Sequence, residues 1–453
     1  MMGQLPAQQN SFFYDFCLER HIPANHLLRR IDQFLDFDRI RQHLQDFYSH
    51  TGRPSIDPEL MIRMLLVGYC YGIRSERRLC DEVNFNLAYR WFCGLGLEDE
   101  VPDHSTFSKN RHGRFREADG LRFTFDTVVQ RCIEQGLVKG EGFAIDASFV
   151  KADVSKHSSE TGPVNWTPAS SQSRAVKEYL AALDEGDSLK RSQKRVSLTD
   201  PMSQWSAAKG PADFYYSTNT MIDVGCGIIM DVEASPSTNV LEARTTKTML
   251  ERVEANHDML PARLMGDTAY GTAENLGYLV EEKKIAPHIP VWDKSKRDDD
   301  TYSQNDFIYI EQEDEYVCPQ GHRLHTTGRV TAEKTLLYRS STKVCGTCPV
   351  RRKCSPNTPM RRIKRSVHEK ARDVARAISL QDDYINKSRH ERKKIEMSYA
   401  HMKRHLGFNR LRLRGLAGAN DEFLLVATAQ NLRKMARYCG QPPPAFGIPA
   451  PES

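Results

Sequence analysis

Long hydrophobic runs are absent from this chain of 453 residues. The apolar run at 423–429 is far shorter than the roughly 20 residues that a membrane-spanning helix needs. The N-terminal residues lack the order of basic, apolar and small residues that marks a secretory signal. We therefore expect a cytoplasmic protein that makes no use of a membrane.

A disulfide framework is not expected either, because a cytoplasmic protein keeps its thiols reduced. Four of the 11 cysteines follow the spacing C-x26-C-x2-C-x5-C, with His322 and His325 near the first of them: Cys318, Cys345, Cys348 and Cys354. A C-x-x-C pair with distant further thiolates is typical of a tetrahedral, structural Zn²⁺ site, which would hold together an insert too small for its own core. The alternative is four reduced thiols in a small packed insert.

Acidic residues are scarce in one C-terminal stretch. Between Arg361 and Arg414 there are 17 Lys and Arg against 6 Asp and Glu, although the net charge of the whole chain is only +5. Cations concentrated in this way predict a polyanionic partner. Nucleic acid fits better than a membrane, because neither an apolar face nor a lipidation signal accompanies the charge.

The first 135 residues have the pattern of a helical domain. Asp57 and Pro58 predict a helix start, with an N-cap followed by proline at the first helical position. At 106–114, Lys109 and Arg111 lie on a short basic helix that is a candidate for DNA recognition. The alternative is an ordinary exposed basic helix.

From residue 141 the pattern changes to α/β. We expect strands at 142–150, 214–219, 227–233, 262–267 and 286–291, with helices at 239–256 and 273–283. Asp146 interrupts the first strand, where a buried carboxylate is costly without a cation, although Lys151 is an alternative partner. Asp267 ends a later strand, where ligands commonly bind, unless it only caps the following turn.

A third acid lies in a basic helix near the C-terminus, at 389–404. Helical spacing puts Arg392, Glu396 and Lys403 near one line. A solvated helix with ordinary ion pairs one turn apart is the alternative.

Asp146, Asp267 and Glu396, in this α/β order, resemble the acids of the DDE transposases of bacterial insertion sequences, whose core is ribonuclease H-like. The segments Thr199-Asp-Pro, Gly266-Asp267-Thr-Ala-Tyr-Gly, the cysteine insert and Gly407-Phe with Arg414-Gly-Leu resemble the eleven-eighty-two branch of that group. Around the glutamate, Arg392 and Lys403 match the family pattern, whereas Arg389 stands where the family has tyrosine.

The resemblance implies that the three acids bind two Mg²⁺ or Mn²⁺ ions. Two such ions, about 3.5–4 Å apart, can assist both the attacking and the leaving oxygen of a phosphodiester. DNA partners would be the terminal inverted repeats and a target, held by a homodimer in a synaptic complex. The expected DNA contacts are Arg392, Lys403, Arg404, Lys109 and Arg111.

The expected fold is thus α/β, with a ribonuclease H-like mixed sheet flanked by helices, an all-helical N-terminal domain and a small Cys-rich insert. The expected segments are 1–135 (helical, DNA-end binding), 136–291 (first part of the core, with a polar insert at 154–211), 292–365 (Cys-rich insert), 366–438 (helical part of the core) and 439–453 (disordered tail). Two other functions stay open: a ribonuclease H-like nuclease without strand transfer, and a non-catalytic DNA-binding relative.

Overall fold

The computed structural model describes residues 16–48, 51, 55–162, 164–166, 173–184, 194–207, 211–236, 242–292 and 301–439. The chain divides into two compact units. The first comprises residues 1–138, 150–216 and 399–453, and the second comprises 139–149 and 217–398. No helix within the described ranges is long and apolar enough to cross a membrane. The tail expected at 439–453 lies outside the described residues, apart from Cys439, as does part of the polar insert.

The first unit is mainly helical, as predicted for the N-terminal region. Its helices are α1 (Leu18–His21), α2 (Leu27–Asp32), α3 (Phe37–Leu44), η1 (Gln45–Phe47), α4 (Pro58–Cys70), α5 (Glu76–Phe85), α6 (Leu87–Phe92), α7 (Ser105–His112), α8 (Arg114–Glu117), α9 (Gly120–Glu134), α10 (Arg174–Asp184) and α17 (Leu416–Tyr438). The helix start at Asp57 is confirmed, because its side chain accepts a hydrogen bond from the Glu59 N–H and Pro58 is the first residue of α4. The long helix α17 packs on α9, α4 and α2.

A buried ion pair ties α17 to the loop that follows α4. The side chain of Glu422 in α17 is 1% exposed and pairs with Arg74, which is 5% exposed. The other Glu422 oxygen accepts hydrogen bonds of 2.6 Å from the backbone N–H groups of Arg412 and Leu413. Because a buried carboxylate is costly without partners, this set of donors is what makes its burial tolerable.

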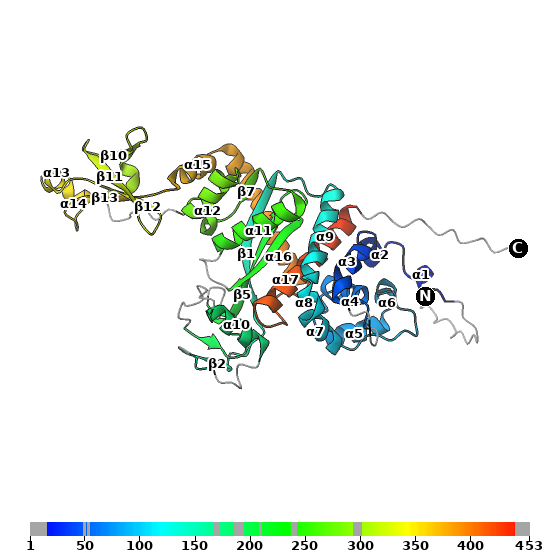
Figure 1. Ribbon diagram of the computed structural model, residues 1–453. Helices are drawn as coiled ribbons and strands as arrows, with labels where there is room; N and C mark the ends of the chain where they lie inside the picture. The colour runs from blue at the N-terminus through cyan, green and yellow to red at the C-terminus, as the bar shows by residue number, and fades with distance from the viewer. Residues whose placement is uncertain are drawn as a thin grey trace, which may run out of the picture. The chain divides into compact units, whose positions relative to one another are not determined.

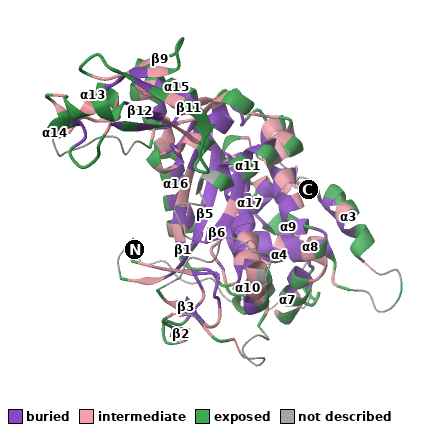
Figure 2. Ribbon diagram, turned by 60° about the vertical axis from the view of Figure 1, so that its left-hand side comes forward, coloured by how far each residue is buried: buried purple, intermediate pink, exposed green. Residues whose placement is uncertain are grey.

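The second unit is built on a mixed sheet in the strand order β6-β5-β1-β7-β8: β6 (Ile229–Pro236), β5 (Asp213–Asp223), β1 (Gly142–Lys151), β7 (Arg263–Met265) and β8 (Ala286–His288). The short strand β4 (Gln204–Ser206) pairs antiparallel with the start of β5, and β2 (Ser159–Glu160) pairs with β3 (Val196–Ser197). Strands β1, β7 and β8 are parallel. Strands β5 and β6 are largely buried (Figure 2).

Helices of the second unit flank this sheet. Helix α11 (Glu242–His257) packs on β6, and α15 (Glu369–Ser379) packs on β8 and on α12 (Ala273–Gly277), which continues into the π-helical turn η5 (Tyr278–Glu282). The mixed α/β class is therefore confirmed. With β1 between β5 and β7, the strand order is that of the predicted ribonuclease H-like core.

The cysteine insert forms its own antiparallel sheet in the order β13-β12-β11-β10-β9 (Figure 1). The 3-10 turn η6 (Gln304–Asp306) precedes it, and the other elements are β9 (Ile308–Ile310), β10 (Glu315–Val317), β11 (Arg323–Val330), β12 (Thr335–Arg339), α13 (Thr342–Gly346), α14 (Arg351–Cys354) and β13 (Arg362–Ser366). Six buried side chains form a core in it: Phe307, Tyr316, Leu324, Tyr338, Cys354 and Ile363. The expectation that the insert lacks a core is wrong, because three aromatic rings supply enough apolar surface to close one side of the sheet.

Helix α16 (Arg389–His405) follows a π-helical turn, η7 (Tyr384–Ser388). Its first half, up to Ser398, belongs to the second unit. There, Arg263 of β7 donates a 2.8 Å hydrogen bond to Glu391, and Ser388 lies 2.7 Å from the ring nitrogen Nδ1 of His288 in β8. These contacts fix the first half of α16 against the parallel edge of the sheet.

Candidate active site

Asp146 lies on the central strand β1, directly after three residues that are fully buried. Its carboxylate accepts a 2.8 Å hydrogen bond from the Ala147 N–H. The pKa of Asp146 is raised to about 6, mainly by burial. The hydrogen bond from Ala147 and the Arg392 guanidinium lower this pKa, whereas the negative charges of Asp267 and Glu396 raise it. Asp267 and Glu396 are therefore close enough for their charges to act on Asp146.

Asp267 follows the neighbouring strand. The parallel register pairs Ala144 with Met265, so Asp146 and Asp267 each lie two residues beyond the same pair. Asp267 also caps the 3-10 turn η4 (Thr268–Tyr270) by accepting a 2.8 Å hydrogen bond from Ala269, as the alternative interpretation required. This bond occupies Oδ1, and a carboxylate has a second oxygen for a further partner.

The turn after Asp267 needs glycine at its end. A Cβ on Gly271 would lie 2.0 Å from the Pro290 carbonyl oxygen. The Trp292 N–H donates a 2.9 Å hydrogen bond to the Gly271 carbonyl. The close backbone approach explains why the sequence Asp267-Thr-Ala-Tyr ends in glycine.

Glu396 is exposed on α16, next to Ile395, which is fully buried. Arg392, one turn earlier, is half-buried, and its charge acts on Asp146. A cation among three acids offsets part of their mutual repulsion. The first half of α16 thus brings both an acidic and a basic side chain near Asp146 in the middle of β1.

The donor set matches divalent magnesium in chemistry. Carboxylate oxygens are hard ligands, and Mg²⁺ usually keeps several waters and binds only one or two protein carboxylates. Among the residues that the structure describes, no three His, Cys, Asp or Glu side chains are gathered around the position of one ion. A two-ion site does not require such a group, because three acids divide between two ions.

Other predicted DNA contacts differ in exposure. Lys403 is half-buried and Arg404 is exposed on the second half of α16, in the first unit. On α7, Lys109 is exposed, whereas Arg111 is 5% exposed and pairs with Glu76 of α5. This burial favours a packing role for Arg111 over contact with DNA.

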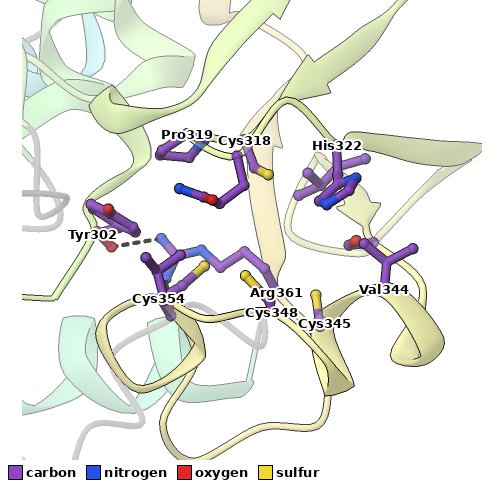
Figure 3. A pocket seen from close by; sticks show the side chains of 13 residues that line it. Tyr302, Cys318, Pro319, His322, Val344, Cys345, Cys348, Cys354 and Arg361 are labelled. Carbon is purple, nitrogen blue, oxygen red and sulfur yellow. Dashed lines mark hydrogen bonds between the residues drawn. The ribbon is translucent and has the colours of Figure 1, made fainter.

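The four cysteines of the insert line one small cavity together with His322 (Figure 3). Burial raises the pKa of the Cys354 thiol, the Arg361 guanidinium lowers it, and the other three thiols raise it further. Arg361 donates hydrogen bonds to the carbonyl oxygens of Cys354 and Tyr302, at 2.8 and 2.9 Å. Histidine 325 does not join this cluster and pairs with Glu315.

The cavity matches zinc by donor type, because thiolates are the ligands of structural zinc sites. Two backbone hydrogen bonds close the turns at the edge of the cavity. The Gly321 N–H donates to the Cys318 carbonyl oxygen at 2.8 Å, and the Cys348 N–H donates to the Cys345 carbonyl oxygen at 3.4 Å. As described above, no three of these thiols are gathered around one ion in the described structure. Zinc binding would therefore require the thiol side chains to turn toward one another.

Sequence reasoning did not foresee the role of Asp200. Its side chain is fully buried and accepts hydrogen bonds from the Tyr216 hydroxyl at 2.6 Å and the Gly415 N–H at 3.1 Å. Burial raises its pKa to about 6. Because Gly415 precedes α17, Asp200 fixes the start of that helix and has a structural role in the first unit.

The mixed sheet, with Asp146 inside β1 and Asp267 just after the parallel strand β7, has the α/β architecture expected of the core. Residues 16–113 match the family model described as a transposase domain (DUF772), and residues 317–436 match the model described as a transposase DDE domain. These two matches support a DDE transposase of the insertion-sequence type. The second match includes Glu396, the four cysteines of the insert and most of α17.

One solved structure was also compared with this chain. The cryo-EM structure of the piggyBac transposase synaptic complex with hairpin DNA matches at 8% sequence identity and a TM-score of 0.35, over 92% of this chain and 76% of that chain. A TM-score this low supports no detailed correspondence between the two proteins.

Proposed function

We propose that this transposase cleaves DNA at the ends of its insertion sequence and joins the freed ends to a target, with Asp146, Asp267 and Glu396 as the catalytic acids. The observation that carries the proposal is the register of β1 and β7, which sets two acids side by side, with the charge of Glu396 in range of Asp146. The matching DDE domain supports the same assignment for Glu396.

The three acids would hold two Mg²⁺ or Mn²⁺ ions. When bound, these ions would stabilise the attacking and leaving oxygens of the phosphodiester. With a pKa of about 6, Asp146 would be partly protonated near pH 6, and a bound cation would favour its ionised form. Arg392 would hold a DNA phosphate next to the acids, and Lys403, Arg404 and Lys109 would bind the backbone further away.

Pairing two ends of one element requires two active sites, so we propose a homodimer bound to two terminal inverted repeats. The protein would act in the cytoplasm, and the eleven-eighty-two branch is the proposed subgroup. A nuclease without strand transfer is the second candidate, since hydrolysis uses the same acids. A non-catalytic DNA binder is less favoured, because the chain has all three acids.

The test is a reaction of the full chain with DNA from the flanks of its own gene, Mg²⁺ and a target plasmid. We expect new 3′-hydroxyl ends at the border of the element, followed by joined products. Ends that form but never join would assign the nuclease function. No cleavage of flanking DNA, with binding retained, would reject both catalytic proposals.

We also propose that Cys318, Cys345, Cys348 and Cys354 bind one structural zinc ion. Four thiolates around zinc carry two net negative charges, and the buried Arg361 next to Cys354 would offset one of them. Because the insert has its own aromatic core, zinc would stabilise a sheet that is already formed, in contrast to the smallest zinc modules, which unfold without metal.

The zinc proposal predicts that the purified protein contains one zinc ion per chain by atomic emission. The double variant C345S/C348S should lose the metal, and its insert should be cut faster by proteases, because two of four ligands are gone. The variant C226S is a suitable control, since Cys226 is a half-buried cysteine outside the insert. Zinc-free wild-type protein, or unchanged zinc in C345S/C348S, would contradict the assignment.

A further inference from the structure

The second half of the cysteine insert has a charge imbalance that neither proposal above uses. Residues 335–366 include nine Lys and Arg and no Asp or Glu, whereas residues 301–334 include six Asp and Glu. Four of the nine cations are engaged within the insert. Arg361 and Arg365 are buried, Lys353 lies 5.3 Å from the ring centre of Tyr302, and Lys364 pairs with Glu333 at 2.8 Å.

The other five cations are exposed, and we call them the basic surface: Arg339, Lys343, Arg351, Arg352 and Arg362. Within the described ranges, none of their side chains forms an ion pair with a carboxylate. They come from β12, α13, α14 and β13, and α13 and α14 lie next to each other at one end of the insert (Figure 1).

Two of these arginines are direct cross-strand neighbours. Arg339 of β12 faces Arg362 of β13 in the antiparallel register. Like charges placed directly opposite each other destabilise a strand pair. A bound anion between the two guanidinium groups would remove that cost.

Protection of an exposed sheet edge is the main alternative explanation. Strand β13 is at the edge of the sheet, and charged side chains on edge strands discourage aggregation. This accounts for Arg362. It does not account for Arg339, because β12 lies between β13 and β11, or for the cations on the two helices.

We propose that the basic surface binds the phosphate backbone of DNA during transposition. Arginine forks match phosphate oxygens, and a phosphate between Arg339 and Arg362 would satisfy both side chains at once. Such contacts position a duplex without reading its sequence. The proposal rests on the proposed function for the presence of DNA, and it assigns to the insert a role separate from cleavage.

The test compares two triple variants of the full chain by fluorescence anisotropy on an end-containing duplex, without divalent metal and over a range of salt concentrations. The variant R339Q/R351Q/R362Q removes three unpaired cations. The control R323Q/K334Q/K364Q removes the same charge from the same insert, but its three cations are paired with Glu315, Glu274 and Glu333. For three lost phosphate contacts, the slope of log K against log salt should become shallower by about 2.7 in the first variant. The control should keep most of the wild-type slope.

A single substitution, R362E, separates binding from folding. Opposite charges at the 339–362 pair should stabilise the pairing of β12 with β13, so the melting temperature should not fall, while DNA binding weakens.

Equal slopes for both triple variants, or unchanged binding by R362E, would overturn the proposal. These binding measurements do not depend on cleavage, so their result remains valid even if the three acids do not cut DNA. Normal slopes together with normal cleavage would reject only the role of the basic surface.

Discussion

The variant E396Q should release no 3′ ends from the element borders at a measurable rate, with a loss of at least about 10³-fold. The reason is electrostatic: glutamine keeps the shape of the side chain but not the charge that would hold a divalent ion, and such an ion contributes several kcal/mol of charge stabilisation in the transition state. D146N and D267N should lose cleavage to a similar extent. All three variants should still bind the end duplex in the anisotropy assay.

A matched control lies on the same helix. Glu391 in α16 is engaged with Arg263 at 2.8 Å, so E391Q removes an equal charge from a carboxylate with a structural partner. Its cleavage rate should fall far less than that of E396Q, by about 10- to 100-fold at most, as for other residues that support a site indirectly. If E396Q cleaves at the wild-type rate, Glu396 is not the third catalytic acid.

The substitution E422A should lower the free energy of unfolding by about 3–5 kcal/mol, the usual cost of removing one partner of a buried ion pair. It would leave the buried Arg74 without its carboxylate and would remove the acceptor of the Arg412 and Leu413 N–H groups. Urea denaturation followed by circular dichroism measures the loss. The expected result is a lower midpoint with little change in slope.

The control for this prediction is E82A on helix α5. Glu82 also pairs with an arginine, Arg78, but the two side chains are 36% and 69% exposed. Exposed pairs contribute about 0–1 kcal/mol, so E82A should change stability by no more than that. Similar losses in E422A and E82A would show that burial does not set the cost of the Glu422 pair.

Elements with strong local signals could be predicted from the sequence. The N-cap at Asp57 followed by proline indicated the start of α4, and the apolar, β-rich run around Asp146 indicated β1. The five strands of the insert were not foreseen, because they are short and several of their faces are exposed, so their hydrophobic alternation is weak. The aromatic core that holds them depends on contacts between residues far apart in the chain.

The sequence indicated the two proposed aspartates by their positions relative to strands. Asp146 lies inside a buried strand, where an isolated charge is costly, and Asp267 follows a short apolar strand, where ligands commonly bind. Whether a charged side chain is exposed or buried cannot be read from the sequence in the same way. Arg111 has the sequence context of a surface cation, but it is buried against Glu76, and Asp200 lies in a polar stretch that gave no sign of burial. Both outcomes depend on tertiary packing that local patterns do not encode.

The π-helical turn η7, directly before α16, sets the direction in which Glu396 points. Such a turn arises when one residue is added to an α-helix. Deleting one residue between Tyr384 and Ser388 would return the turn to α-helical geometry and rotate the preceding chain relative to α16 by about 100°. If the preceding chain stayed in place, α16 would rotate as a whole, so Glu391 would lose its hydrogen bond from Arg263 and Glu396 would turn away from β1 together. Deleting one residue outside the three proposed catalytic acids is thus expected to uncouple the helix from the sheet.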